Sequence, residues 1–325
     1  MVGVGTCNAV ATGPASSPFY TEGTLNISIS VTDTESPVIT PPGAQSASTD
    51  TGVNTAMLDV TSLGSVTDNS GTTPAITYAI GGTPLAGAYA FPIGVTTVTM
   101  DASDGAGNAA VQQSFTVTVT DGEVPVITAP GPQSASTDAG ANTATLDVTS
   151  LGSVTDNSGT TPAITYAISG TPLSGAYAFP LGVTTVTMDA SDGAGNAAVQ
   201  QSFTVTVTDG EVPVITAPGP QSASTDAGAN TATLDVTSLG SVTDNSGTTP
   251  AITYAISGTP LSGAYAFPLG VTTVTMDASD GAGNAAVQQS FTVTVTDGEV
   301  PVITAPGPQS ASTDAGANTA TLDVT

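Results

Sequence analysis

Hydrophobic and polar residues alternate along this chain in short runs. In the segment 203–208, Phe203, Val205 and Val207 fall on one face of an extended chain, and threonines fall on the other. A side-chain period of two is typical of a β-strand with one buried face, and the sequence shows none of the 3.6-residue periodicity of an amphipathic helix. The pattern therefore predicts an all-β fold.

The segment 121–208 illustrates the predicted elements. We expect its strands at residues 124–127, 143–149, 163–168, 183–190 and 203–208, with residues 133–137 continuing the first strand after a Pro-Gly-Pro break and short segments punctuated by proline and glycine between 168 and 182. The stretches 153–159 and 192–196 are rich in Asp, Asn, Ser and Gly, which favour turns, and we predict loops there. About seven short strands in fewer than 100 residues are typical of an immunoglobulin-like β-sandwich.

This pattern recurs with a fixed period of 88 residues. The motif Asp-x-Glu-x-Pro starts at residues 33, 121, 209 and 297. Residues 121–208 and 209–296 are identical at every position, and residues 33–120 differ from them at ten positions. A unit of this length fits a small independent domain and is too long for one turn of a solenoid. We therefore predict tandem immunoglobulin-like β-sandwich domains in a linear array.

The repeat boundaries divide the chain into five segments. Residues 1–32 are a tail or the end of an incomplete preceding domain, with its last strand at about 24–32. Three complete repeats follow at 33–120, 121–208 and 209–296. Residues 297–325 are a partial fourth repeat with its first strands only. Both ends are consistent with a segment cut from a longer array of repeats, and equally with a protein whose terminal domains are incomplete.

The composition excludes several classes of function. The chain has no Lys, Arg or His, and its 26 Asp and Glu residues give a net charge of −26. Without basic residues it cannot neutralise nucleic-acid phosphates or anionic membrane surfaces, and without imidazole the familiar catalytic triads are absent. Cys7 is the single cysteine, so no intramolecular disulfide can form. No segment approaches the ~18 consecutive apolar residues that a membrane-spanning helix requires. We do not expect residues 1–13 to be a signal peptide, because they lack a cationic start and an apolar stretch.

Several motifs of the repeat resemble one known family. The run Ala-Phe-Pro-Leu-Gly-Val-Thr-Thr-Val-Thr-Met-Asp-Ala-Ser-Asp-Gly-Ala-Gly-Asn at 178–196, followed by Phe-Thr-Val-Thr-Val at 203–207, resembles the hyalin repeat (HYR) family. Thr-Asp-Asn at 155–157 and Pro-Val-Ile-Thr at 125–128 match its earlier motifs. The resemblance covers 33–325 and implies an immunoglobulin-like fold with extracellular roles in adhesion or matrix.

The sequence departs from this family in one respect. Family members usually carry cysteines at three places where this chain has Ser158, Ala129 and, approximately, Gln201. The disulfides that the resemblance implies are therefore absent, and another device must stiffen the domains.

Oxygen-bearing side chains concentrate in three segments of each repeat: the linker, the Asp-Asn loop and the Asp-Gly-Ala-Gly-Asn loop. In an immunoglobulin sandwich these segments share one pole, which faces the preceding domain. Calcium prefers six to eight hard oxygen ligands, and the chain has no cation to balance these acids. We therefore predict a structural Ca²⁺ at each junction. The candidate ligands are Asp33, Glu35, Asp68, Asn69, Asp104 and Asn108; Asp121, Glu123, Asp156, Asn157, Asp192 and Asn196; and Asp209, Glu211, Asp244, Asn245, Asp280 and Asn284.

Other interpretations of these residues stay open. Asp and Asn are common in turns because they bond their own backbone, so the loops can be turn chemistry alone. Asp147 and Asp189 point outward from strands and act against edge pairing. Paired carboxylates also suit glycosidases, but few aromatics are present to line a cleft and the constellation recurs unchanged. Outward Thr rows can form a flat ligand- or ice-binding face, and Asn26 begins a glycosylation sequon.

These observations predict a non-enzymatic, extracellular structural protein: a stalk or filament of the cell surface with calcium-stiffened junctions. We expect self-association into a fibre or array, or further repeats of the same chain, with no nucleic-acid partner. Residues 297–325 and the strand at 24–32 can complete each other between molecules, and truncation explains the same ends equally well. The alternative function is an adhesin array whose repeats bind a glycan or protein on a cell surface or matrix.

Overall fold

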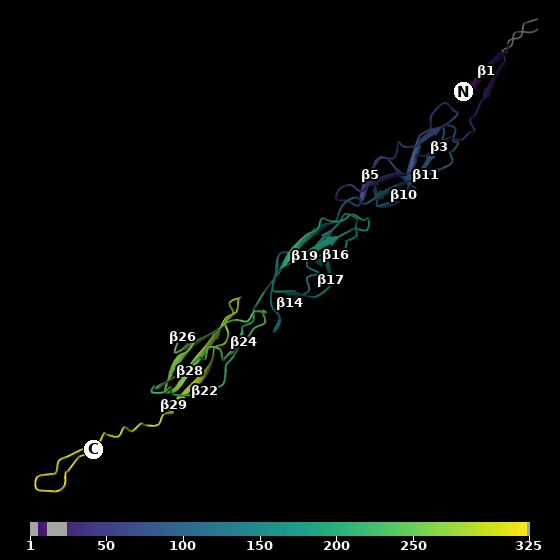
Figure 1. Ribbon diagram of the computed structural model, residues 1–325. Helices are drawn as coiled ribbons and strands as arrows, with labels where there is room; N and C mark the ends of the chain where they lie inside the picture. The colour runs from purple at the N-terminus through teal and green to yellow at the C-terminus, as the bar shows by residue number, and fades with distance from the viewer. Residues whose placement is uncertain (1–5, 12–24, 324–325) are drawn as a thin grey trace, which may run out of the picture. The chain divides into compact units, whose positions relative to one another are not determined.

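The computed structural model describes residues 6–11 and 25–323, and all regular secondary structure in these residues is β-strand (Figure 1). This confirms the all-β fold. No helix in the described part of the chain could span a lipid bilayer. Strands β1 (Thr6–Ala11) and β2 (Leu25–Ser30) pair antiparallel. Residues 1–5 and 12–24 of the predicted tail, and residues 324–325 of the predicted fourth repeat, lie outside the described residues, as do the side chains of Cys7 and Asn26.

Each repeat contains nine strands. In repeat 1 they are β3 (Val38–Thr40), β4 (Gln45–Ser48), β5 (Thr55–Leu58), β6 (Ser65–Thr67), β7 (Ile76–Ile80), β8 (Thr83–Leu85), β9 (Tyr89–Pro92), β10 (Gly94–Ala102) and β11 (Gln113–Thr120). In repeat 2 they are β12 (Val126–Thr128), β13 (Gln133–Ser136), β14 (Thr143–Leu146), β15 (Ser153–Thr155), β16 (Ile164–Ile168), β17 (Thr171–Leu173), β18 (Tyr177–Pro180), β19 (Gly182–Ala190) and β20 (Gln201–Thr208). In repeat 3 they are β21 (Val214–Thr216), β22 (Gln221–Ser224), β23 (Thr231–Leu234), β24 (Ser241–Thr243), β25 (Ile252–Ile256), β26 (Thr259–Leu261), β27 (Tyr265–Pro268), β28 (Gly270–Ala278) and β29 (Gln289–Thr296).

The strands of a repeat form a five-stranded sheet and two strand pairs. In repeat 1 the sheet has the order β4-β11-β10-β7-β8, and the pairs are β3-β6 and β5-β9. All neighbours are antiparallel except β4 and β11, which run parallel with Val117 opposite Gln45. Repeat 3 repeats this arrangement as β22-β29-β28-β25-β26 with β21-β24 and β23-β27.

The core of each repeat lies between the five-stranded sheet and the two pairs. In repeat 1 the buried cluster joins Val98, Met100 and Val117 of the sheet to Ile39 and Phe91 of the pairs. Alternate residues of β10 and β11 point into this cluster, while the threonines of β11, with Thr97 and Thr99 of β10, lie on the opposite face, as the period of two predicts. The two apolar faces therefore close into a β-sandwich, which confirms the predicted architecture of the single repeat.

The tightest packing in the core surrounds a glycine that precedes β6. The hydroxyl of Tyr78 accepts a hydrogen bond from the N–H of Gly64 at 3.1 Å. A Cβ atom on Gly64 would lie 2.0 Å from the Cε atom of Met100. A larger residue at this position would therefore have to displace the end of the buried Met100 side chain, and repeats 2 and 3 have the same close approach at Gly152 and Gly240.

Two details of the strand prediction were wrong. Residues 153–155, predicted as part of a loop, form strand β15, because they pair with β12 and bury Val154. Residues 133–136 do not continue the preceding strand across the Pro-Gly-Pro break; they cross to the edge of the five-stranded sheet beside β20. Both features depend on partners far away in the sequence, which a local pattern does not reveal.

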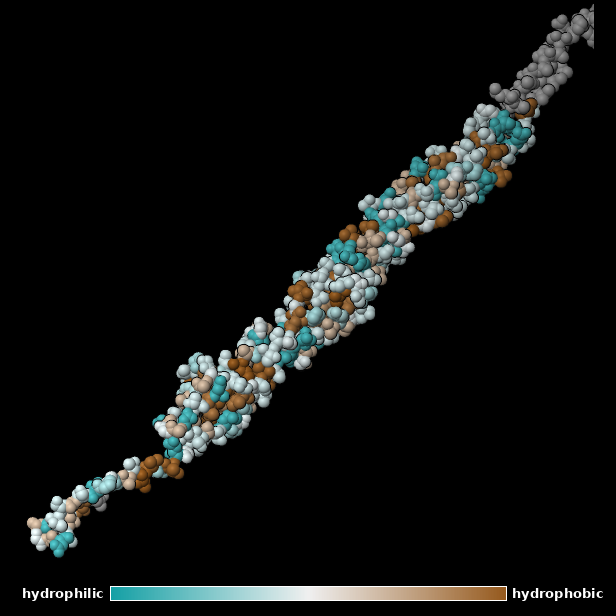
Figure 2. Space-filling model, viewed as in Figure 1, coloured by the Kyte–Doolittle hydropathy of each residue, from teal (hydrophilic) through white to brown (hydrophobic). Residues whose placement is uncertain are grey.

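Residues 297–323 contain none of the first strands that we predicted for a fourth repeat. In a complete repeat the equivalent segments pair with later strands, as β21 pairs with β24 and β22 with β29, and the described residues 297–323 have no such partner strands. The side chains of Val302 and Ile303 are consequently 88% and 92% exposed. Figure 2 shows the start of this C-terminal segment as a brown, apolar stretch.

The chain divides into two compact units. The first comprises Met1–Ser134, Thr145–Phe179 and Val183–Thr206, and the second comprises Ala135–Ala144, Pro180–Gly182 and Val207–Thr325. The first unit therefore contains repeat 1 with most of repeat 2. The second contains repeat 3 together with two turns of repeat 2, so these turns group with the repeat that follows them.

Candidate metal centre

Each repeat gathers three aspartates at one end. In repeat 2 they are Asp121 before β12, Asp156 after β15 and Asp192 after β19, and one carboxylate oxygen of each lies within 4.8 Å of the others. Repeats 1 and 3 gather the equivalent residues, which are Asp33, Asp68 and Asp104 in the former and Asp209, Asp244 and Asp280 in the latter. The linker and the two loops therefore meet at the pole, and we refer to each group as an aspartate triad.

The loop after β19 holds its aspartate in a fixed orientation. Oδ1 of Asp192 accepts hydrogen bonds from the N–H groups of Ala194, Gly195 and Asn196 at 2.9, 2.7 and 2.8 Å, and Oδ2 accepts one from Nδ2 of Asn196 at 2.7 Å. Gly195 has a φ of 97°, which a residue with a side chain rarely adopts, so the Asp-Gly-Ala-Gly-Asn sequence is what allows this turn.

These hydrogen bonds also set the charge of the loop aspartate. Burial raises the pKa of Asp192, but the Asn196 amide and the backbone N–H groups of the loop outweigh it and hold the pKa below its ordinary value. Asp104 and Asp280 have lowered pKa values for the same reasons. This carboxylate is therefore fully ionised near neutral pH.

The other two aspartates of a triad each leave one buried oxygen without a partner. Asp121 is only 8% exposed; its Oδ1 accepts hydrogen bonds from Thr49 and from the N–H of Glu123, but its Oδ2 has no partner. Asp156 accepts bonds from Ser158 at Oδ2, and its buried Oδ1 has no partner. The same two atoms are unpartnered in the other triads: Oδ2 of Asp33 and Asp209, and Oδ1 of Asp68 and Asp244.

This arrangement is electrostatically costly, and a cation would offset that cost. A buried anionic oxygen without a hydrogen bond carries a desolvation penalty, and three neighbouring carboxylates repel one another. The chain has no Lys, Arg or His to balance them. Carboxylate oxygens are hard ligands, so the triad fits Ca²⁺ or Mg²⁺ better than a softer transition metal.

The amide of Asn196 braces the triad. Its Nδ2 donates to Oδ2 of Asp192 and also to the backbone carbonyl of Asp121 at 3.2 Å. Asn108 and Asn284 make the equivalent pair of bonds in repeats 1 and 3. These predicted ligands therefore hold two ligand-bearing segments together by their nitrogen.

The predicted glutamate and Asp-Asn loop asparagine reach the preceding repeat instead. In the first unit, Glu123 accepts a hydrogen bond from the N–H of Gly52 at 2.9 Å, and Nδ2 of Asn157 donates to the carbonyl of Val53 at 2.9 Å. In the second unit, Glu211 and Asn245 make the same contacts to Gly140 and Ala141. Glu35, Glu123 and Glu211 do not belong to the triads.

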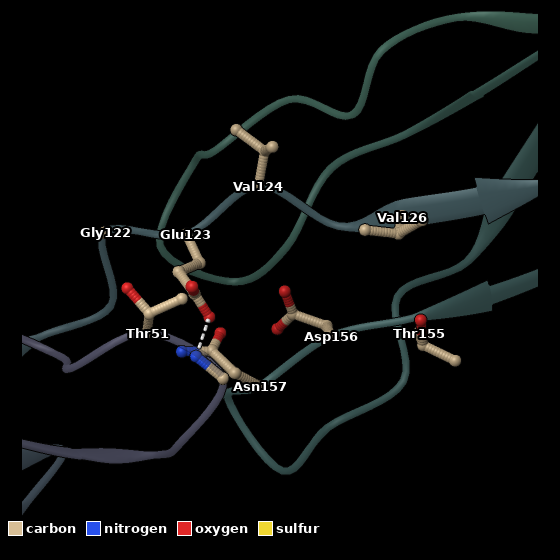
Figure 3. A pocket seen from close by; sticks show the side chains of 9 residues that line it. Thr51, Gly122, Glu123, Val124, Val126, Thr155, Asp156 and Asn157 are labelled. Carbon is tan, nitrogen blue, oxygen red and sulfur yellow. Dashed lines mark hydrogen bonds between the residues drawn. The ribbon is translucent and has the colours of Figure 1, made fainter.

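An open hollow separates the glutamate from the triad. Figure 3 shows Glu123, Asp156 and Asn157 among the side chains that line it, and Glu123 accepts the hydrogen bond from the N–H of Gly52. The hollow is lined by Thr51, Gly52, Gly122, Glu123, Val124, Val126, Thr155, Asp156 and Asn157. An equivalent hollow in the second unit involves Gly140, Glu211 and Asp244. Asp156 thus lines this hollow, while its unpartnered Oδ1 is buried.

Sequence analysis missed one functional residue, Thr49, and its equivalent Thr137. The hydroxyl of Thr49 donates to Oδ1 of Asp121 at 3.3 Å and accepts from Nδ2 of Asn157 at 3.2 Å. The chain is rich in threonine, so no local signal distinguished this position.

Comparisons with known proteins give one family and several structural likenesses. The profile of the HYR domain matches residues 32–119, 120–207 and 208–295. A search of curated proteins found no match. A three-domain immunoglobulin segment of titin, in a glutamate-to-alanine variant, is similar at 11% identity and a TM-score of 0.41, over 82% of this chain and 100% of that one.

Two adhesion proteins are also similar in structure. Drosophila N-cadherin domains EC1–4 align at 12% identity and a TM-score of 0.35, over 89% of this chain and 82% of theirs. The N-terminal eight immunoglobulin domains of Down Syndrome Cell Adhesion Molecule align at 14% identity and a TM-score of 0.31, over 84% of this chain and 38% of theirs. The three successive profile matches, which span most of the sequence, establish that this chain belongs to the HYR domain family.

Proposed function

We propose that this chain is an extracellular, adhesion-type structural protein whose HYR repeats act as spacers, and that each aspartate triad binds one Ca²⁺. Tandem repeats with identical sequence suit a molecule whose function depends on length, and membership of the HYR family favours an extracellular location. The proposal includes no catalytic role, because the chain has no imidazole and its acids recur unchanged at the same end of every repeat.

The unpartnered oxygens of the triads carry this proposal. In repeat 2, Oδ2 of Asp121 is buried within a group of three carboxylates and accepts no hydrogen bond. A divalent ion would supply the missing positive charge and coordinate this oxygen. Ca²⁺ is favoured over Mg²⁺ because it accepts irregular sets of oxygens, whereas Mg²⁺ demands near-octahedral geometry, and extracellular modules bind Ca²⁺ with dissociation constants of about 10⁻⁴–10⁻³ M.

Calorimetric titration of the full chain with Ca²⁺, combined with thermal melting in Ca²⁺ and in EGTA, tests the proposal. We expect about three ions per chain and a higher melting temperature in Ca²⁺, since a ligand at 100 times its dissociation constant stabilises the folded state by about 2.7 kcal/mol. Asp156→Asn should remove one site. Asp189→Asn is the matched control, because Asp189 lies outside the triads and its carboxylate accepts hydrogen bonds from Nε2 of Gln200. Identical melting curves in Ca²⁺ and EGTA would refute the calcium proposal.

A second candidate function is assembly into a filament through strand pairing between chains. The observation that favours it is the exposure of Val302 and Ile303, at 88% and 92%, because their counterparts in repeat 3, Val214 and Ile215, lie in strand β21. Unpaired strand-forming segments are templates for pairing with another chain. Light scattering over a range of concentrations should show a growing mass, and deletion of residues 297–325 should abolish that growth. A monomer at every concentration would exclude it.

A further inference from the structure

We propose that one threonine in each of repeats 1 and 2 couples the triad of the next repeat to the turn that this next repeat contacts, so that Ca²⁺ binding and closure of this contact strengthen each other. This inference rests on the proposed calcium function. Thr49 and Thr137 form this link, and their counterpart Thr225 does not.

In the first unit, the hydroxyl of Thr49 joins two ligand-bearing segments. It donates to Oδ1 of Asp121, a triad residue whose Oδ2 is buried without a partner, and it accepts a hydrogen bond from Asn157. Asn157 directly follows Asp156, the second aspartate of the triad, and also donates to the carbonyl of Val53. Thr49 therefore fixes the linker and the Asp-Asn loop relative to the turn that follows β4.

The second unit repeats this link with a different turn sequence. Thr137 donates to Oδ1 of Asp209 at 3.3 Å and accepts from Nδ2 of Asn245 at 3.2 Å, and Asn245 also donates to the carbonyl of Ala141. Ala141 stands where repeat 1 has Val53, yet the bond persists because the acceptor is the backbone. The link thus requires the threonine hydroxyl and the asparagine amide, and tolerates changes in the turn.

Thr225 provides an internal comparison. Its backbone N–H still bonds to the carbonyl of Thr296, and Gly228 still donates to Glu299 at 2.8 Å. The Thr225 hydroxyl, however, is buried without a partner. The Asp-Asn loop of a following repeat is absent from the described residues after 297. The link therefore forms only where a folded triad follows, although repeats 2 and 3 have identical sequences.

The consequence is reciprocal coupling. An ion bound between Asp121, Asp156 and Asp192 needs the first two residues at a fixed separation, and Thr49 helps to set that separation. Outer-shell partners of metal ligands commonly contribute about tenfold or more to metal affinity. By thermodynamic linkage, the ion must then stabilise the contact at Thr49 and Val53 by the same factor. Ions leaving the triad would loosen the turn of the preceding repeat.

The test compares Thr49→Val with Thr225→Val in the full chain. Calorimetry with CaCl₂ as the probe should show one of the three sites of Thr49→Val weakened by about three- to tenfold, since Val removes a hydroxyl at nearly constant size. Thr225→Val should leave all three sites unchanged, and Thr49→Ser, which keeps the hydroxyl, should restore the lost affinity. Equal weakening by both Val variants, or by neither, would overturn the proposal.

Hydrogen exchange gives the reciprocal readout. Residues 49–57 differ from their counterparts in the other repeats at positions 51, 53 and 57, so peptides from this turn are identifiable by mass. Ca²⁺ should slow their exchange in the wild-type chain and in Thr49→Ser, and not in Thr49→Val. If the wild-type chain binds no Ca²⁺, the proposed function itself fails. If the wild-type chain binds Ca²⁺ and the Thr49→Val variant binds it with the same affinity, only the coupling fails.

Discussion

Residues 209–235 and 297–323 have the same sequence and different structures. The first segment contains strands β21, β22 and β23, and it buries Ile215 to 7% exposure. The second contains no strand, and the equivalent Ile303 is 92% exposed. The strands of this protein are therefore determined by their partners. Backbone pairing and burial of apolar side chains must offset the conformational entropy lost on ordering, and an unpartnered segment gains neither.

The turn within the two segments behaves differently from the strands. In repeat 3 the N–H of Asp226 bonds to the carbonyl of Thr231 at 2.7 Å, and in the C-terminal segment the N–H of Asp314 bonds to that of Thr319 at 2.8 Å. The carboxylate of each aspartate also accepts the N–H and hydroxyl of the threonine seven residues later. All of these partners are local, so the turn forms in both settings.

The largest expected effect comes from supplying the missing partners. A chain extended after Thr325 by a copy of residues 238–296 completes the fourth repeat, and residues 297–325 should then form strands. At about 0.05–0.15 kcal/mol per residue over 88 residues, the new domain should be stable by about 4–13 kcal/mol. Hydrogen exchange of the extended chain measures this gain. Continued rapid exchange in residues 297–325 would show that partners are not what these strands lack.

The reverse experiment removes the partners of residues 209–235 by weakening the core of repeat 3. Phe267 is fully buried, and Phe267→Ala should cost about 3–5 kcal/mol because it leaves a cavity. Tyr265→Ala is the control: Tyr265 is 39% exposed and contributes an edge contact to the Phe267 ring at 4.9 Å, worth about 0.5–1.5 kcal/mol. Urea unfolding should rank the two variants in this order, and equal losses would contradict the core assignment.

The local turn should contribute to stability only inside a folded repeat. Asp226→Ala removes the acceptor of Thr233 and should lower the free energy of unfolding of repeat 3 by about 1–3 kcal/mol. The same change at Asp314 should leave the unfolding of every repeat unchanged, although it removes the same local bonds. The two denaturation curves give this difference directly. A destabilising Asp314→Ala would mean that the C-terminal segment supports repeat 3.

The smallest expected effect is a dependence on acidic pH confined to the folded repeats. The hydroxyl and N–H of Thr237 hold the pKa of Asp235 below its ordinary value of 3.8, and Asp59 and Asp147 are lowered in the same way. A lowered pKa adds stability above the unfolded value, and this contribution is lost as the pH falls through the folded value. Denaturation of the wild-type chain and of Asp235→Asn should therefore differ above about pH 4 and converge below it. A difference that grows toward low pH would have the wrong sign.

The sequence predicted the elements whose pattern is local. The alternation at 203–208 matches β20, and the long strand at 183–190 matches β19 to within a residue. The prediction of a loop was wrong at Ser153–Thr155. These three residues, with one apolar side chain, form a strand because β12 lies beside them. The parallel pairing beside the closing strand was also missed, since register between distant segments leaves no trace in local periodicity.

The candidate site shows the same division. The linker and loop aspartates were placed at one pole by the geometry of the immunoglobulin sandwich, and they do lie together. The roles of the other oxygen-bearing side chains were not predictable, because composition does not reveal that Asn196 presents its nitrogen or that Glu123 reaches Gly52. Thr49 acts through contacts 72 and 108 residues away along the sequence.

Anomalous diffraction from crystals of the full chain grown with Ca²⁺ tests the central claim most directly. The account predicts one peak in each triad, with Oδ2 of Asp121 and Oδ1 of Asp156 at about 2.3–2.6 Å from the ion in repeat 2. Triads without a peak, or calcium bound only at other surface carboxylates, would contradict it.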